Sequence, residues 1–414
     1  MKAEIISVGT ELLLGDIVNT NSQYISRRLM DLGISVYHQS VIGDNEERLM
    51  EEYKLSFSRS EMIITTGGLG PTNDDLTKEV AAKYFNKKLI LHDEVINNIK
   101  EYFKKRNIDM NESNKKQALF PEGCEIIPND NGTAPGCIIS ENNKTIILMP
   151  GPPKEMMPMF EKYIVPYLEK LTDGTIVSKV LRVSGIGESH MEEMVKDIIM
   201  EGDNPTIAPY AKDVEAILRI TAKGKTKEEC LSLIGPIEDR IREILKENIY
   251  ATDETAIESV VGDMLIRNKL AIATAESCTG GLLAGRLINY PGISDVLKEG
   301  VITYSNEAKE KRLKVKHETL EAFGAVSSET AGEMARGIRE VAEANIGMST
   351  TGIAGPGGGS EEKPVGLVYI GLCINGNTIT KRLLISGSRD KVRERSVFEA
   401  LDFLRRELNK MGIY

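Results

Sequence analysis

The segment Thr274-Ala275-Glu276-Ser277-Cys278-Thr279-Gly280-Gly281 follows a short apolar run at residues 270–273 and precedes a helical sequence at residues 282–288. This order indicates a buried strand, a sharp polar turn and a helix. Ligand sites of open α/β sheets lie at the carboxyl ends of strands, so the turn places the Ser277 hydroxyl where a ligand is expected. Two roles fit that hydroxyl: it is a candidate nucleophile, or it caps the helix that follows.

Short apolar runs alternate with amphipathic helical stretches in the first and the last third of the chain. Strand and helix alternating at this pitch predict βαβ units around a mainly parallel sheet. A chain of 414 residues is longer than a single hydrophobic core usually accommodates. We therefore expect an α/β protein with two α/β domains, residues 1–170 and 254–414. A small α+β module at residues 171–253 joins them. Within it, Gly235-Pro236 predicts a break in a long helix.

Composition limits the class of protein. The chain has 52 basic and 62 acidic residues and a net charge of −10, so no global attraction to nucleic acid is expected, and we predict no direct DNA binding. Its five cysteines are dispersed, which argues against a disulfide framework and a cysteine zinc site. The sequence starts directly with a strand pattern, and no apolar run is long enough to cross a bilayer. We therefore expect a cytoplasmic protein without membrane association.

A glycine-rich loop follows the third predicted strand, in the run Thr66-Gly67-Gly68-Leu69-Gly70-Pro71-Thr72-Asn73-Asp74-Asp75. Glycines allow close approach of the backbone to a ligand, and a helix predicted from Pro71 would offer its N–H groups to an anion. Gly68, Gly70 and Thr72 are therefore candidate phosphate-binding residues. Asp74 and Asp75 are candidate ligands of a hard divalent cation, but acidic residues in a first helical turn also serve simply as caps.

Three further segments accompany this loop: residues 9–16, residues 131–136 and the run Pro150-Gly151-Pro152-Pro153-Lys154-Glu155. Together the four resemble the molybdopterin-binding (MogA-like) domain at the N-terminus of the CinA family. In that family the domain is associated with a metal-dependent ADP-ribose pyrophosphatase activity. The resemblance implies that Asp74, Asp75 and Glu155 lie near a diphosphate and a divalent metal ion such as Mg²⁺.

In the last third, Lys309 is the candidate base for Ser277. A lysine acts as a base only when burial or a nearby cation lowers its pKa, and otherwise it is an ordinary exposed helix lysine. The glycine-rich run at residues 352–359 is either an oxyanion-binding loop or a flexible surface loop. Arg389 and Arg393 stand four residues apart, either to pair with a phosphate or as a solvated helix face.

From about residue 255 onward the chain resembles the C-terminal domain of CinA proteins, which also occurs alone as the nicotinamide-nucleotide amidohydrolase PncC. The resemblance lies in residues 274–281, 303–309, 352–359 and 363–366. It implies Ser277 as nucleophile and Lys309 as base, with no cofactor in this domain. It also implies a substrate-binding group, which consists of Tyr304, Thr351, Gly352 and Arg393.

The expected function is hydrolysis of the carboxamide of nicotinamide mononucleotide to nicotinate mononucleotide and ammonia, with ADP-ribose pyrophosphatase activity in the first domain. The alternative is a non-catalytic nucleotide- or pterin-binding protein in a competence-related complex. We expect small-molecule nucleotides as partners and a homodimer.

The turn at residues 184–189 has two readings, a KH-like clamp for nucleic acid and a structural turn. The glutamates that follow it favour the structural turn, because they repel phosphates.

Overall fold

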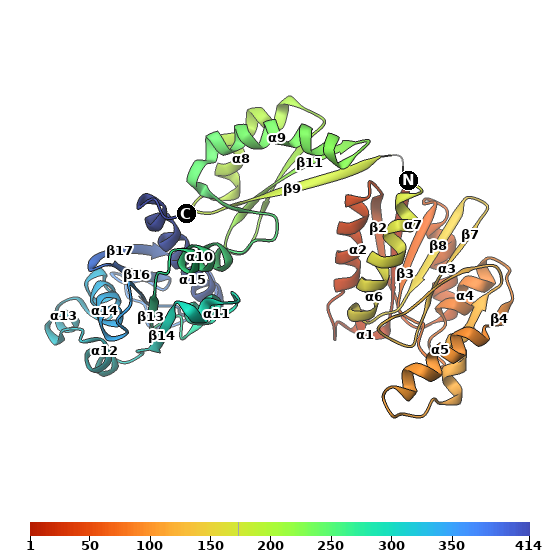
Figure 1. The fold of residues 1–414 in the computed structure, drawn as a ribbon, viewed down its shortest axis with the longest axis horizontal. Helices are drawn as coiled ribbons and strands as arrows, with labels where there is room; N and C mark the ends of the chain where they lie inside the picture. The colour runs from red at the N-terminus through yellow and green to blue at the C-terminus, as the bar shows by residue number, and fades with distance from the viewer. Residues whose placement is uncertain (173) are drawn as a thin grey trace. The chain divides into compact units, whose positions relative to one another are not determined.

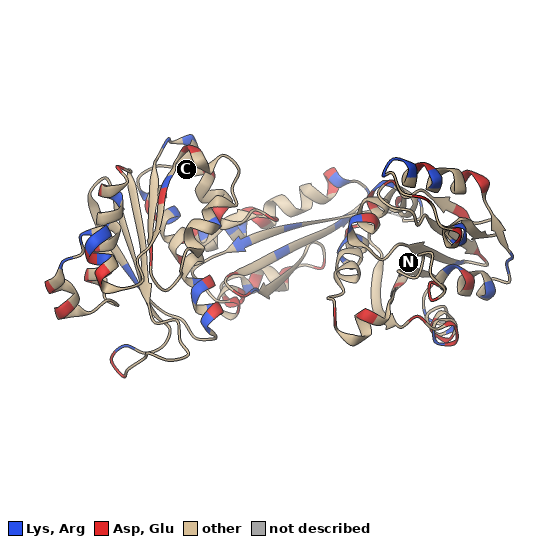
Figure 2. Cartoon of the chain, turned by 90° about the horizontal axis from the view of Figure 1, so that it is seen from below, with Lys and Arg blue, Asp and Glu red and all other residues tan. Residues whose placement is uncertain are grey.

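The computed structural model describes residues 1–172 and 174–414. The chain divides into two compact units, residues 1–177 with 222–232 and residues 178–221 with 233–414. Sheets covered by helices make up both units, so the predicted α/β class is confirmed (Figure 1). Basic and acidic residues are interspersed along the helices (Figure 2). No helix within the described residues has the length and apolar character needed to span a bilayer.

A six-stranded sheet forms the centre of the first unit. In spatial order its strands are β2 (Ser35–Ile42), β1 (Lys2–Val8), β3 (Met62–Thr66), β8 (Lys144–Met149), β7 (Gly136–Glu141) and β6 (Glu125–Ile127). The first four run parallel, and β7 and β6 are antiparallel to their neighbours. The parallel strands therefore bring their carboxyl ends, and the loops that follow them, to one edge of the sheet.

Helices cover both faces of this sheet. On one face lie α3 (Glu46–Ser56), α4 (Thr77–Tyr84) and α5 (Asp93–Lys104). On the other lie α2 (Thr20–Asp31), α6 (Pro153–Met159), a π-helical turn (Phe160–Ile164) and α7 (Val165–Glu169). Successive strand residues point to opposite faces, so Ile63 joins the first layer and Ile64 the second. The remaining elements are α1 (Thr10–Leu14), a 3₁₀ helix (Glu112–Ala118) and the pair β4 (Leu89–Leu91) and β5 (Leu119–Pro121).

The predicted helix start at Pro71 is wrong. Helix α4 begins at Thr77, and the residues between them form turns. The physical reason is that a side chain competes with the helix for a backbone N–H group. The Asp75 carboxylate accepts hydrogen bonds from the N–H and the hydroxyl of Thr72 and so stabilises a turn there. The loop ends only where the Thr77 hydroxyl donates to Gly67 O at 2.9 Å.

The middle part of the chain forms a four-stranded sheet with two helices. Its strands, in spatial order, are β10 (Thr206–Ala211), β11 (Ala216–Gly224), β9 (Thr175–Val183) and β12 (Ile249–Thr252), and its helices are α8 (Glu188–Glu201) and α9 (Lys227–Leu245). The predicted break at Gly235-Pro236 is wrong, since α9 runs through Pro236. Cys230, Ile234, Ile241 and Leu245 recur at helical spacing and are buried, so packing of this face outweighs the cost of the proline.

The C-terminal part of the second unit contains a five-stranded sheet. Its strands, in spatial order, are β14 (Leu297–Ile302), β13 (Ile272–Glu276), β15 (Ile346–Gly352), β16 (Leu367–Ile374) and β17 (Asn377–Leu384). The first three run parallel and the last two antiparallel. Helices α10 (Ile257–Arg267), α11 (Leu282–Ile288) and α15 (Arg389–Lys410) pack on one face, and α12 (Asn306–Leu313), α13 (His317–Phe323) and α14 (Ser328–Val341) on the other.

Helix α14 crosses the end of α12 so closely that only glycine fits at position 337. A Cβ atom there would lie 1.9 Å from Leu313 O. We expect Gly337→Ala to lower the free energy of unfolding by about 1–3 kcal/mol, because backbone must move. Gly285→Ala is the matched control, since Gly285 is an exposed α11 glycine with no atom within 4 Å of an added Cβ. That variant should gain about 1 kcal/mol from helix propensity. Urea unfolding measures both, and equal midpoints would contradict the tight crossing.

Candidate active site

The turn after β13 holds the Ser277 hydroxyl at the carboxyl edge of the five-stranded sheet. Ser277 N donates to Thr350 O on the neighbouring strand at 2.9 Å, which fixes the start of the turn. Gly280 N then donates to Ser277 O at 3.1 Å. Gly280 and Gly281 have φ values of 60° and 95°, which favour glycine and allow the chain to reverse into α11. The side chain of Ser277 is 8% exposed, so it is sheltered at the base of this turn.

Lys309 meets Ser277 from the first turn of α12. Ser305 caps that helix by accepting from Ala308 N at 3.2 Å. The Lys309 side chain is 1% exposed, and its Nζ donates to Thr303 O at 2.9 Å, Tyr304 O at 3.2 Å and Ser277 Oγ at 3.3 Å. Burial lowers the pKa of this amine below its ordinary value of 10.5. When the amine is neutral, it keeps two N–H groups for the carbonyl oxygens and a lone pair that can accept from the Ser277 hydroxyl, which is the arrangement that a lysine base requires.

Glu276 is a residue whose importance sequence reasoning missed. Its side chain is 1% exposed and accepts from Thr279 Oγ1 at 2.6 Å, and from the N–H groups of Gly281, Leu283 and Ala284 at 3.0, 3.0 and 2.9 Å. The available signal was a glutamate that ends an otherwise apolar strand, because a buried carboxylate must find donors nearby.

The N–H groups left over in the turn belong to Cys278 and Thr279. Within the described residues, neither donates to a backbone oxygen, and both face the Cys278 sulfur, which is a weak acceptor. They follow Ser277 directly, so they are the donors available to an oxyanion formed next to its Oγ. The Cys278 thiol is buried, and desolvation raises its pKa to about 12. It is therefore a protonated packing group at neutral pH.

Two arginines from the start of α15 border this turn. Arg393 Nη2 donates to Thr279 O at 3.0 Å. Arg389 Nη1 donates to Gly355 O at 2.8 Å, and its Nη2 lies 3.5 Å from the Tyr304 hydroxyl, whose ring is largely exposed. The structure thus places Arg393 against the turn that carries Ser277, and Arg389 beside Tyr304, whose carbonyl oxygen accepts from Lys309. Such a cationic rim suits a phosphate.

Thr351 and Gly352, two predicted substrate-binding residues, lie at the end of β15. The Thr351 hydroxyl is buried and donates to Ala325 O at 2.6 Å, so it already has a partner. At Gly352 an added Cβ would lie 2.7 Å from Leu367 O, which shows how closely β16 approaches.

In the first unit, the loops after β3 and β8 meet at the carboxyl edge of the sheet. Gly67 N donates to Met149 O at 3.0 Å, and a Cβ on Gly151 would lie 3.5 Å from Gly67 Cα. Lys116 adds a cation over the glycine-rich loop, with Nζ donating to Thr72 O at 2.8 Å. This edge therefore combines Gly68, Gly70 and Thr72 with the Lys116 ammonium, which also pairs with Glu79 at 3.6 Å.

The three predicted metal ligands do not form a ready-made cation site. Asp74 is exposed, and Asp75 is engaged with Thr72. The Glu155 carboxylate accepts from Asn129 Nδ2 at 2.8 Å. Within the described residues, no group of three or more His, Cys, Asp or Glu side chains is arranged to hold a metal ion. A cation here would therefore need oxygens from the ligand's own phosphates, as Mg²⁺ often does.

The turn after β9 is tied to helix α15. Ser184 Oγ donates to the buried Asp402 at 2.9 Å, and Arg406 Nη2 donates to Ser184 O at 3.3 Å. These contacts give the turn at residues 184–189 a structural role.

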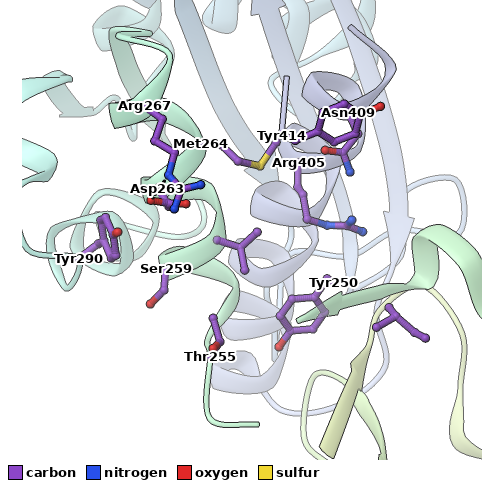
Figure 3. Close-up of a pocket in the computed structure, with 12 residues that line it drawn as sticks. Tyr250, Thr255, Ser259, Asp263, Met264, Arg267, Tyr290, Arg405, Asn409 and Tyr414 are labelled. Carbon is purple, nitrogen blue, oxygen red and sulfur yellow. Dashed lines mark ion pairs between the residues drawn. The ribbon is translucent and has the colours of Figure 1, made fainter. Parts of the chain in front are cut away.

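A cavity of about 590 Å³ in the second unit lies between α10, β12 and the end of α15 (Figure 3). Its polar lining includes the ion pair between Arg267 and Asp263, whose closest atoms are 2.9 Å apart. Neither Ser277 nor Lys309 lines this cavity, so it is separate from the serine site.

Comparison with known proteins covers nearly the whole chain. Residues 254–408 match the "CinA C-terminal domain", residues 4–170 the "Probable molybdopterin binding domain", and residues 178–251 the "Damage-inducible protein CinA KH domain". A "Putative competence-damage inducible protein" of Clostridium acetobutylicum is 62% identical over 408 residues, which cover 99% of each chain. Its namesake in Clostridium novyi is 61% identical over 413 residues, which cover 100% of each chain.

Among solved structures, the competence/damage inducible protein CihA from Agrobacterium tumefaciens is 42% identical. The match covers 37% of this chain and 96% of that chain, with a TM-score of 0.35. The similarity to the Clostridium proteins extends over all three matched domains, and on this ground the chain belongs to the CinA family of competence-damage inducible proteins.

Proposed function

We propose that the C-terminal domain hydrolyses the carboxamide of nicotinamide mononucleotide to nicotinate mononucleotide and ammonia. The observation that carries this proposal is the buried Lys309 Nζ, 3.3 Å from Ser277 Oγ. The resemblance of residues 274–281 and 303–309 to the nicotinamide-nucleotide amidohydrolases supports the choice of substrate. The cationic rim of Arg389 and Arg393 suits its phosphate.

The reaction proceeds through an acyl-enzyme. Lys309, as the neutral amine, takes the hydroxyl proton while Ser277 Oγ bonds to the amide carbon. The N–H groups of Cys278 and Thr279 donate to the carbonyl oxygen as it becomes negative. The C–N bond then breaks, and Lys309 returns the proton to the nitrogen, which leaves as ammonia. A water molecule cleaves the ester by the same proton transfers and restores Ser277.

Ser277→Ala should reduce ammonia release from nicotinamide mononucleotide by about 10³-fold or more, because the bond-forming atom is removed. Cys278→Ala should retain activity, since that thiol is protonated and only fills space. An enzyme-coupled ammonia assay on purified protein compares the two. Full activity of Ser277→Ala would reject the mechanism.

Lys309 should impose a rising pH–rate profile. The base is the neutral amine, so the rate climbs as the pH passes upward through the pKa of Lys309 and then levels off. Burial lowers this pKa, which places the rise below 10.5. Lys309→Arg keeps a permanent charge and should lose about 10²–10⁴-fold in rate. Lys311→Arg changes an exposed lysine on the same helix and is the control. A Lys309→Arg variant with wild-type rate and profile would exclude a lysine base.

A second activity is proposed for the first unit: cleavage of ADP-ribose to AMP and ribose 5-phosphate. The meeting of the glycine-rich loop with the Gly151 loop beside Lys116 supports a diphosphate site there. A divalent cation, when bound with the substrate, would supply charge neutralisation at the phosphates, held by Asp74, Asp75 or Glu155. The chain itself contributes the loop backbone and the Lys116 ammonium. The rival is binding of a nucleotide or pterin without turnover.

Asp75→Asn tests this second site. Loss of the charge also weakens the turn that Asp75 makes with Thr72, so metal-dependent hydrolysis of ADP-ribose should fall by about 10–100-fold. AMP formation is followed by chromatography with and without Mg²⁺. Ser277→Ala, which changes the other proposed site, serves as the control and should leave AMP formation unchanged. Unaltered hydrolysis by Asp75→Asn would remove Asp75 from the site. Tight ADP-ribose binding without AMP formation in the wild type would favour the rival.

A further inference from the structure

Glu276 lies inside the turn that carries Ser277, and both of its carboxylate oxygens are used. Oε2 accepts from Thr279 Oγ1, Gly281 N and Leu283 N, and Oε1 accepts from Ala284 N, at distances of 2.6 to 3.0 Å. The side chain is 1% exposed. A carboxylate buried to this degree is tolerated only because several donors replace its water.

These donors include N–H groups that the first turn of α11 cannot satisfy within the helix. The residue before α11 is Gly281, which has no side chain to cap it. Glu276 instead reaches forward across the turn to donors five, seven and eight residues away. The segment enclosed by these bonds contains Ser277, so the carboxylate fixes the nucleophile's turn as well as the helix end.

The same bonds divide the N–H groups of the turn into two sets. Glu276 takes those of Gly281, Leu283 and Ala284, whereas within the described residues those of Cys278 and Thr279 donate to no backbone oxygen and face only the weakly accepting Cys278 sulfur. The start of α11, where a helix attracts anions, is thus filled by the chain's own carboxylate. This carboxylate would repel a substrate phosphate from the helix start, whereas Arg389 and Arg393, at the start of α15, carry positive charge near the turn.

The far end of the turn is fixed through Thr279. Its hydroxyl lies 2.6 Å from Glu276 Oε2 and 2.6 Å from Thr350 Oγ1 on β15. Thr350 O in turn accepts from Ser277 N. Glu276 therefore connects the nucleophile's turn to the neighbouring strand by a short chain of hydrogen bonds.

We infer that Glu276 is a positioning residue for the serine reaction: its carboxylate aligns Ser277 and leaves the Cys278 and Thr279 N–H groups for the oxyanion. The inference rests on the proposed amidase function for its choice of assay. It requires that removal of the carboxylate weakens the chemical step while substrate binding at the arginine rim persists.

The test uses full-length protein with the substitutions Glu276→Ala, Glu276→Gln and Glu276→Asp. In the alanine variant kcat should fall by roughly 10²-fold, the effect of misplacing an oxyanion donor, with KM little changed. Glu276→Gln should also have a low kcat, because the N–H groups of its amide would point at the N–H donors of the turn instead of accepting from them. Glu276→Asp keeps the charge but lengthens the hydrogen bonds, so its kcat should lie between those of the wild type and the alanine variant. Added formate, which fits the vacated space, should restore kcat to Glu276→Ala but not to Ser277→Ala.

A second measurement separates this inference from the choice of substrate. A fluorophosphonate probe phosphonylates an activated serine whatever its natural substrate: the serine oxygen bonds to phosphorus and fluoride leaves. Mass spectrometry follows its attachment to Ser277. Labelling should be slower in Glu276→Ala and faster again with formate. If the wild type releases no ammonia but shows this pattern, the amidase assignment fails and the inference stands. Folded Glu276→Ala with wild-type kcat and labelling rate would overturn it.

Folding is checked by circular dichroism and thermal melting. Asp402→Asn is the matched control, because Asp402 is another buried carboxylate of this unit, bonded to Arg405 and Arg406. Asp402→Asn should melt at a lower temperature than the wild type, and formate should not change its kcat. If Glu276→Ala does not fold, Glu276→Asp decides: a lower kcat at unchanged KM supports the inference, and a wild-type kcat overturns it.

Discussion

The C-terminal site depends on one costly interaction, the burial of the Lys309 amine beside a serine hydroxyl. Within the described residues its hydrogen bonds go to two carbonyl oxygens and to Ser277 Oγ, and no carboxylate forms an ion pair with it. Water is excluded, so the charged form is disfavoured and the pKa is lowered. The strands and helices that surround the amine sustain this cost, and the lowered pKa favours the neutral form, which is the form of lysine that can act as a base.

Glu276 is the buried carboxylate of the same site, and the structure keeps its role separate from that of Lys309. The carboxylate is saturated by N–H and O–H donors from the turn and from α11, while the lysine is held by carbonyls of the segment before α12. Each group therefore has its own hydrogen-bond partners, and neither neutralises the other. This separation leaves Lys309 as the partner of the Ser277 hydroxyl, and within the described residues it leaves the Cys278 and Thr279 N–H groups without a backbone acceptor, as stabilisation of an oxyanion would require.

Helix α15 links the serine site to the middle module of the same unit. Its first turn carries Arg389 and Arg393, which lie near the turn that carries Ser277. Its last turns carry Asp402, Arg405 and Arg406, which are bonded to one another and to Ser184 and Glu247. Burial makes these ion pairs specific in geometry, since a broken pair would leave an unsolvated charge. The turn at residues 184–189, for which the sequence favours a structural role, is thereby an anchor between secondary-structure elements.

Local patterns in the sequence determined much of this protein. Alternating apolar runs and helical stretches predicted the α/β class, and glycine-rich loops after strands predicted where sites would lie, because period and turn chemistry are local properties. Pro71 and Pro236 misled the prediction, since a side-chain hydrogen bond from Thr72 to Asp75 and the buried face of α9 outweigh intrinsic preferences. The sequence alone makes Lys309 a candidate base, but only tertiary packing decides that its amine is buried and lies 3.3 Å from Ser277 Oγ. The role of Glu276 was likewise set by tertiary structure, because burial alone turns an ordinary glutamate into the acceptor that organises a turn.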